Sequence, residues 1–253
     1  MGFDKSLIVA KTDLKMALQV SYVKYSLILI AAFGPVMVLA TVGLLAFAIP
    51  SEAEFVRVMQ MTSPTISPML GLVAIIPASL IAANALVGER EQNTLEPLLC
   101  TPLTDRELLI GKVLSSFIPS IALLLGSILE SEIGTFILLM LAGYPPMLVP
   151  DIAGLFLLLT AGPLMILAVN SMMILISGKV TRVYEAYQTS GATVMVFILP
   201  MILPMVTLSG GGIDLAAVWF SNILTTLIAA ALFIVTWALA FNRFNRDHMV
   251  SLV

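Results

Sequence analysis

A chain of 253 residues that is 60% hydrophobic and only 11% charged cannot fold as an ordinary soluble domain, because soluble domains carry about 25% charged residues. Most of its surface must therefore face lipid. The single cysteine and the single histidine exclude an intrachain disulfide and a His/Cys metal cluster.

Residues 1–25 predict a helix that lies in the membrane interface. Leu7, Leu14, Leu18 and Tyr25 fall near one side of a helical wheel, while the lysines fall off that arc or at its margin. An apolar stripe beside lysines is typical of a helix that lies along lipid headgroups. The alternative is a frayed, solvated leader.

Six hydrophobic runs are long enough to cross a bilayer, which takes roughly 20 apolar residues in a helix. These predicted spans cover residues 26–49, 67–87, 113–142, 152–177, 190–207 and 216–241. Residues 50–66 are expected to form a short polar loop, and residues 242–253 a polar tail. We therefore expect an all-α polytopic membrane protein whose residues 1–253 form a single transmembrane domain.

The basic residues predict the orientation of these spans. With the N-terminus in the cytoplasm, an even number of spans returns the C-terminus to the same side. Eleven of the twelve Lys and Arg residues are then cytoplasmic and only Arg57 is outside, as the positive-inside rule requires. The eleven are Lys5, Lys11, Lys15, Lys24, Arg90, Arg106, Lys112, Lys179, Arg182, Arg243 and Arg246. We expect a multi-pass protein of the cell (plasma) membrane with both termini cytoplasmic.

The segment from Gly88 to Lys112 is the longest polar interruption between two hydrophobic spans, yet its pattern is that of ordered structure. Thr94 is a good helix N-cap before three leucines at helical spacing, and Pro102 ends that short helix. Thr104 and Glu107 form a second capping box, whose helix runs directly into the third span. We therefore predict a short amphipathic helix under the membrane, tied to the span behind it.

Four polar residues in the predicted spans are candidates for a substrate path. Glu130 and Glu132 lie at the outer end of the third span, where a carboxylate in hydrocarbon costs several kcal/mol. One interpretation is a cation or polar-substrate site near the outer exit. The alternative ends the membrane helix just before them and makes residues 133–141 a shallow or re-entrant segment. Asn84 and Asn170 either line a substrate path or form hydrogen bonds between helices.

Motifs of enzyme chemistry are missing from the sequence. HExxH and GxSxG do not occur, and one histidine alone forbids the first. The two Gly-Lys pairs, at Gly111–Lys112 and Gly178–Lys179, lack both the earlier glycine and the following Ser or Thr of a phosphate-binding P-loop. We expect no catalytic residue, no metal site and no ATP site in this chain.

Polar and apolar positions recur at fixed spacing across the segment between spans two and three. They are Glu89, Arg90, Glu91, Thr94, Leu95, Glu96, Leu98, Leu99, Thr101, Pro102, Gly111 and Lys112. In this spacing they resemble the signature of ABC-2 type transporter permeases, although Asn93 stands where that family usually has Gly. Residues 180–188 are similar to the second cytoplasmic loop of drug- and sodium-efflux-like members.

The resemblance implies a permease subunit of an ATP-driven exporter. Such a permease pairs with a second permease subunit, as a homo- or heterodimer, and separate ABC ATPase subunits hold the ATP and magnesium. Residues 88–112 are then the coupling region on which the ATPase docks. The implied ATPase-coupling residues are Glu89, Arg90, Glu91, Thr94, Leu95, Glu96, Leu98, Leu99, Thr101, Pro102, Arg106 and Lys112, and the implied second contact consists of Arg182, Glu185 and Gln188.

A different class of transport protein is the alternative. A stand-alone secondary transporter or channel needs no ATPase partner. No inverted repeat and no charge pair at the membrane midplane are visible in the sequence, which argues against this class. On the exporter hypothesis the partners are the ATPase, a second permease and the lipid bilayer, with no nucleic acid and no cofactor bound by this chain. The short outer loops leave the substrate open, with a slight preference for cationic or amphipathic cargo.

Overall fold

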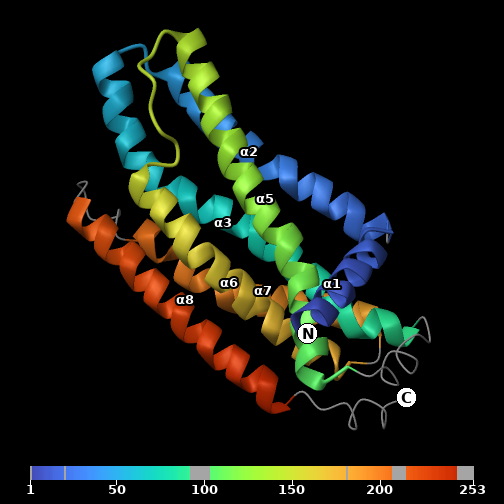
Figure 1. Ribbon diagram of the computed structural model, residues 1–253. Helices are drawn as coiled ribbons and strands as arrows, with labels where there is room; N and C mark the ends of the chain where they lie inside the picture. The colour runs from blue at the N-terminus through green and yellow to red at the C-terminus, as the bar shows by residue number, and fades with distance from the viewer. Residues whose placement is uncertain (1, 20, 92–102, 181, 207–214, 244–253) are drawn as a thin grey trace.

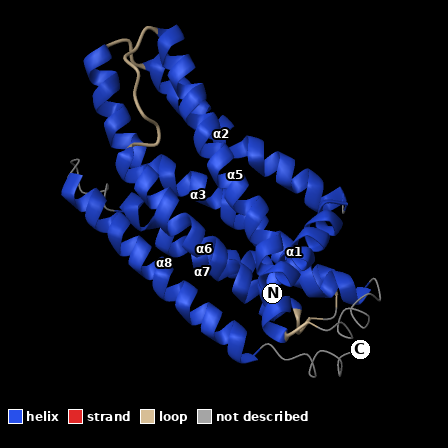
Figure 2. Ribbon diagram, viewed as in Figure 1, coloured by secondary structure: helices blue, strands red, loops and turns tan. Residues whose placement is uncertain are grey.

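The computed structural model describes residues 2–19, 21–91, 103–180, 182–206 and 215–243, and within these residues all regular structure is helical (Figures 1 and 2). The helices are α1 (Gly2–Gln19), α2 (Ser21–Ala48), α3 (Glu52–Glu91), α5 (Asp105–Ala142), α6 (Ile152–Ser177), α7 (Val183–Val206) and α8 (Leu215–Arg243). Six of the seven, all except α1, are long and apolar enough to cross a membrane. The expected all-helical, six-span architecture is confirmed for the described part of the chain.

Helices α3 and α6 occupy the centre of the bundle. Helices α2 and α5 pack on one side of them, and α7 and α8 on the other. Most of the apolar span of α3 is buried, whereas α2 and α8 leave most of their span exposed. Large side chains such as Phe33, Phe47 and Ile234 lie on that exposed surface, as expected of helices whose solvent is hydrocarbon.

Residues 52–66 are helical, so the prediction of a polar loop there is wrong. They form the first turns of α3, which is 40 residues long. Glu52 and Glu54 lie in the first turn, where carboxylates interact favourably with the helix dipole. Phe55 and Met59, one turn apart, are fully buried, and the Phe55 ring stacks on Tyr144 with 4.2 Å between centroids. In the sequence, Phe55 and Met59 stand among polar residues, so the sequence does not indicate that this face is buried.

Helix α5 is continuous for 38 residues, so the alternative of a re-entrant segment over residues 133–141 is also wrong. Its start is the predicted capping box: the Thr104 amide donates to Glu107 Oε2 at 2.8 Å, and the Glu107 amide donates to Thr104 Oγ1 at 3.3 Å. Its end is Gly143, whose φ of 79° favours glycine. Figure 1 shows α5 extending with α2 and α3 beyond the ends of α6 and α8.

Helix α1 packs against the first turns of α5. Ser6 Oγ donates a hydrogen bond to the Glu107 carbonyl oxygen at 3.0 Å. A Cβ atom at Gly111 would lie 2.8 Å from the Val9 side chain and 3.0 Å from the Ser6 carbonyl oxygen. Only glycine therefore permits this close approach. The interfacial position of α1 in the membrane stays a prediction.

Candidate functional site

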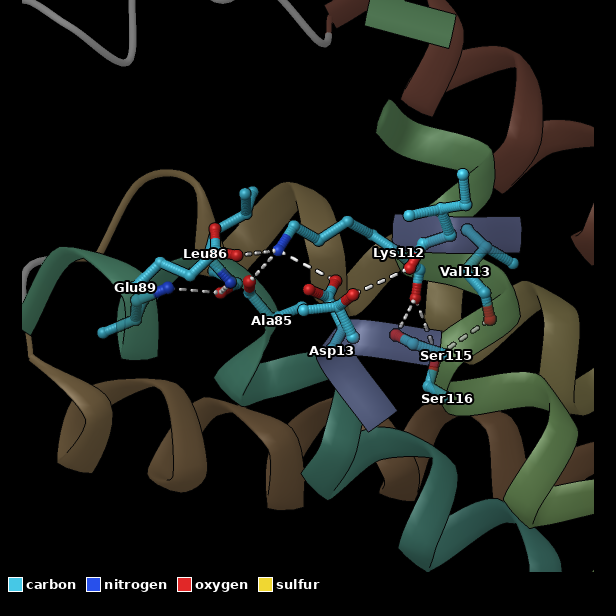
Figure 3. A network of polar contacts seen from close by, with 12 residues as sticks. Asp13, Ala85, Leu86, Glu89, Lys112, Val113, Ser115 and Ser116 are labelled. Carbon is cyan, nitrogen blue, oxygen red and sulfur yellow. Dashed lines mark hydrogen bonds and ion pairs between the residues drawn. The ribbon is translucent and has the colours of Figure 1, made fainter. Parts of the chain in front are cut away.

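A buried ion cluster joins the two helices that flank residues 92–102. Lys112 lies two turns into α5, and its Nζ donates hydrogen bonds to Glu89 Oε1 at 2.6 Å and to the Ala85 carbonyl oxygen at 2.7 Å, both at the end of α3. Asp13 Oδ2 of α1 lies 3.0 Å from the same Nζ and forms an ion pair without hydrogen-bond geometry. One ammonium group thus holds three helices together (Figure 3).

Helical spacing explains how this cluster forms. Ala85 and Glu89 are four residues apart on α3 and therefore share one face. Ser115 Oγ donates to the Lys112 carbonyl oxygen at 2.8 Å and Ser116 Oγ donates to the Val113 carbonyl oxygen at 3.1 Å, so both hydroxyl groups are satisfied within α5 (Figure 3).

The cluster is nearly sealed from solvent. The Lys112 side chain is 0% exposed, that of Glu89 9% and that of Asp13 12%. Burial raises the pKa of Asp13, and the Lys112 charge acts in the opposite direction. Within the described residues no group of three His, Cys, Asp or Glu is placed to hold a metal ion. The arrangement is suited to holding the three helices in register.

Two of the predicted ATPase contacts are buried. Glu89 and Lys112 lie inside this chain, with 7% and 0% of their surface exposed. Arg106 and Glu91 are exposed at the same end of the bundle. Arg90 belongs to α3, but its side chain lies outside the described residues, as do all atoms of Thr94, Leu95, Glu96, Leu98, Leu99, Thr101 and Pro102.

The second predicted contact lies beside the first. Glu91 Oε1, in the last turn of α3, accepts a hydrogen bond at 2.8 Å from the amide of Val183, the first residue of α7. Ser177 Oγ, at the end of α6, accepts from the Leu86 and Val87 amides at 3.1 Å each. The exposed side chains of the predicted second contact are Arg182, Glu185 and Gln188. The structure therefore brings the α6–α7 connection against the end of α3.

Sequence reasoning missed Asp13. It is not among the candidate residues predicted from the sequence. Asp13 lies three residues after Ala10 and four before Ala17, and both alanines are buried. A carboxylate on the same face as two small residues is the signal that could have identified it, because small residues mark a close helix contact.

The four polar residues of the predicted substrate path lie in separate places. Asn170 is buried, and with its amide nitrogen facing α3 it donates to the Ala78 carbonyl oxygen at 3.1 Å and accepts from the Phe117 amide at 3.3 Å. Asn84 lines a cavity of about 40 Å³ beside the ion cluster. Glu132 accepts from the Val149 amide at 3.4 Å, whereas Glu130 is exposed on α5.

Comparison with known protein families agrees with this architecture. The family model described as ABC-2 family transporter protein matches residues 7–218, which include the ion cluster and both predicted contact regions. A comparison with curated proteins gave no match. A match over most of the chain, together with six long apolar helices, identifies a multi-pass membrane component of a transporter. The chain therefore belongs to the ABC-2 family of transporter membrane proteins.

Proposed function

We propose that the chain is the permease subunit of an ATP-driven exporter, coupled through residues 88–112 to a separate ATPase. The observation that carries the proposal is the ion cluster of Lys112, Glu89 and Asp13. It joins the two helices on either side of the coupling segment to each other and to α1. A segment anchored in this way transmits a push to the bundle, whereas a free loop absorbs it.

The path of that push follows the helices. When ATP binding closes the ATPase subunits, they move the coupling segment. The Lys112 cluster makes the ends of α3 and α5 move together with α1. Because α5 is one uninterrupted helix, a displacement at Asp105 reaches its far end as a rigid-body motion. Access to the substrate path then changes on the opposite side of the membrane.

In the assembled exporter, the partner subunits supply the ATP chemistry and the second half of the transmembrane dimer. ATP and magnesium bind to the ATPase subunit, and this chain supplies no catalytic group. A second permease subunit, identical or homologous, completes the transmembrane dimer. The N-terminus faces the cytoplasm of a plasma membrane, because that orientation places eleven of the twelve basic residues inside.

Co-purification of the full chain tests this function. An affinity-tagged permease in mild detergent is expected to retain a soluble P-loop ATPase in near-equal amount. Arg106→Glu combined with Arg182→Glu is expected to release it, since both side chains are exposed beside the coupling segment and charge reversal makes close contacts repulsive. Arg57→Glu is the matched control, because Arg57 is exposed in α3, near the opposite end of that helix.

The outcomes separate the two classes of transporter. Loss of the ATPase in the double variant, with retention in Arg57→Glu, supports the coupled exporter. A permease that transports its substrate with no ATPase bound, or an ATPase that ignores the double reversal, contradicts it. Glu89 and Lys112 are unsuitable for this test because they are buried, and changing them disturbs the fold itself.

A further inference from the structure

A groove on the membrane face of the bundle runs between α2 and α5. It has a volume of about 360 Å³, and its lining includes Leu27 and Ala31 of α2 and Ala122, Gly126 and Glu130 of α5. Sites for small molecules typically measure about 300–1,000 Å³ and are mostly apolar with a few polar groups. A Cβ atom on Gly126 would meet nothing within 4 Å, so small residues keep the groove open.

The packing of α2 on α5 places Glu130 at the depth of the middle of α2. Gly134 packs on Leu39, and Gly43 packs on Leu138. The two helices therefore run in parallel with a constant register, which makes Glu130 level with Pro35. Pro35 stands near the centre of α2, a helix of 28 residues. Because α2 spans about 42 Å at 1.5 Å per residue, its centre falls inside a hydrocarbon core about 30 Å thick.

Glu130 differs from its neighbour Glu132 in what it touches. Glu132 is half-buried and accepts a hydrogen bond from the Val149 amide. Glu130 is exposed and, within the described part of the chain, forms no hydrogen bond and no ion pair. A carboxylate at this depth costs several kcal/mol unless another group pairs with it or neutralises it. No described residue of this chain supplies that partner.

A second copy of this chain has no described cation at the right depth. Lys24 lies eleven residues before Pro35 on α2, about 16 Å along the helix axis. Val73 of α3 packs at Gly34, next to Pro35, and Arg57 lies sixteen residues before Val73 on α3. Arg57 is therefore also far from the depth of Glu130. Two copies with the same membrane topology are related by an axis along the membrane normal, so each residue keeps its depth. Among its described residues, the partner copy would bring a second carboxylate to this depth and no positive charge.

We propose that the α2–α5 groove binds a hydrophobic organic cation from the bilayer, with Glu130 as its counter-ion. The apolar body of the ligand lies between the two helices against Leu27, Ala31 and Ala122. Gly126 provides the space for it, and the Glu130 carboxylate pairs with the charge in a medium where such a pair is strong. The binding itself is independent of the proposed function, but the further step that the bound cation is exported cargo rests on it.

Binding of tetraphenylphosphonium to the full chain tests the proposal. Radiolabelled tetraphenylphosphonium is equilibrated with the permease in phosphatidylcholine nanodiscs, and empty nanodiscs give the lipid background. The structurally similar anion tetraphenylborate is the probe for non-specific partition. We expect saturable binding of the cation and none of the anion. Glu130→Gln is expected to weaken the affinity on the order of tenfold or more, while Glu130→Asp retains most of it.

Two further variants separate a specific site from general destabilisation. Gly126→Leu fills the groove without touching the charge and is expected to abolish binding. Glu132→Gln is the matched control, two residues away, and is expected to leave binding unchanged. Equal binding of the cation and the anion to the wild-type chain overturns the proposal without any variant. The proposal is also overturned if Glu130→Gln binds the cation with wild-type affinity, or if Glu132→Gln loses as much affinity as Glu130→Gln does.

The result is independent of the test for the ATPase. Saturable cation binding by a chain that retains no ATPase contradicts the proposed function and leaves this inference intact. A coupled ATPase with no cation binding contradicts this inference alone.

Discussion

At the scale of single residues, the protein depends on one ammonium group shared by two carboxylates. The Lys112 side chain is fully buried and donates hydrogen bonds to Glu89 and the Ala85 carbonyl oxygen, with Asp13 on its other side. Burying three ionised groups is costly, and their attraction offsets that cost only while all partners are present. Removing Lys112 leaves two buried carboxylates without a cation, whereas removing Asp13 or Glu89 leaves Lys112 with one carboxylate.

Lys112→Met is expected to lower the free energy of unfolding by about 3–5 kcal/mol, because it leaves two carboxylates buried without a cation. Thermal unfolding of the detergent-solubilised protein measures the effect. Lys179→Met is the control, since Lys179 is exposed and surface substitutions usually change stability by less than about 0.5 kcal/mol. Equal melting temperatures for the two variants would show that the ion cluster does not stabilise the fold.

Asp13→Asn is expected to change how stability depends on pH. Burial raises the pKa of Asp13 above its ordinary value, so the folded state holds this proton more tightly than the unfolded state. The stability that this group contributes is complete below the unfolded pKa and is lost as the pH rises through the folded pKa. Asp13→Asn lacks this loss.

Melting curves from pH 4 to pH 7 check the sign of that effect. The melting temperature of Asp13→Asn relative to wild type should rise as the pH increases. A difference that falls with increasing pH, or that does not vary, contradicts the assignment. Lys11→Gln serves as the control, because it changes a charge on the exposed face of the same helix.

At the scale of helices, α5 is the element that connects the two sides of the membrane. It begins at a capping box, carries Lys112 two turns later, passes Glu130 in its second half and ends at Gly143. No described residue in it breaks the helix, although Pro119 lies inside. A helix of 38 residues spans about 57 Å, which exceeds the hydrocarbon core. Because the helix is uninterrupted, a movement of its first turn displaces its far end as well.

Thr104→Ala is expected to fray the start of α5. It removes the side chain that accepts from the Glu107 amide, and loss of an N-cap typically costs about 1 kcal/mol. The predicted result is a melting temperature a few degrees lower and weaker stimulation of the ATPase by the permease. Thr41→Ala is the control, since its hydroxyl bonds only within α2. Unchanged coupling in Thr104→Ala would show that a stiff start to α5 is dispensable.

At the scale of the whole molecule, the charges are sorted along the membrane normal. Glu91, Arg106 and Arg182 lie at one end of the bundle, where the ion cluster joins α1, α3 and α5. Arg57 lies at the opposite end of α3. The same sorting that predicts the orientation therefore also gathers the predicted ATPase contacts on one side.

Cysteine labelling in intact cells tests this orientation. The chain has a single cysteine, Cys100, in the predicted cytoplasmic segment. A membrane-impermeant maleimide is expected to leave it unlabelled until the cells are opened. Arg57→Cys in a Cys100→Ser background is expected to be labelled from outside. Labelling of Cys100 in intact cells would invert the topology and remove the ATPase from its proposed docking side.

Sequence patterns predicted the helical class, the six spans and the start of α5, because each depends on local composition. Span length follows from about 20 apolar residues, and the Thr104–Glu107 capping box needs only three residues of spacing. The buried face of residues 52–66 escaped prediction, since Phe55 and Met59 are apolar points in a polar stretch and their partner Tyr144 is distant in sequence. The continuity of α5 past Glu130 agrees with the predicted span over residues 113–142.

Hydrophobicity and charge distribution by themselves determined that this protein crosses a membrane repeatedly and predicted which side carries its basic residues. Only the tertiary structure decided which charges face inward. Lys112 and Glu89 are predicted as coupling residues from the sequence, and the structure shows that they form buried ion contacts within the chain, with Asp13 of α1 beside them. The physical reason is that membrane insertion depends on the total hydrophobicity of each segment of the chain. The burial of one charged side chain depends instead on a partner that other helices bring close to it.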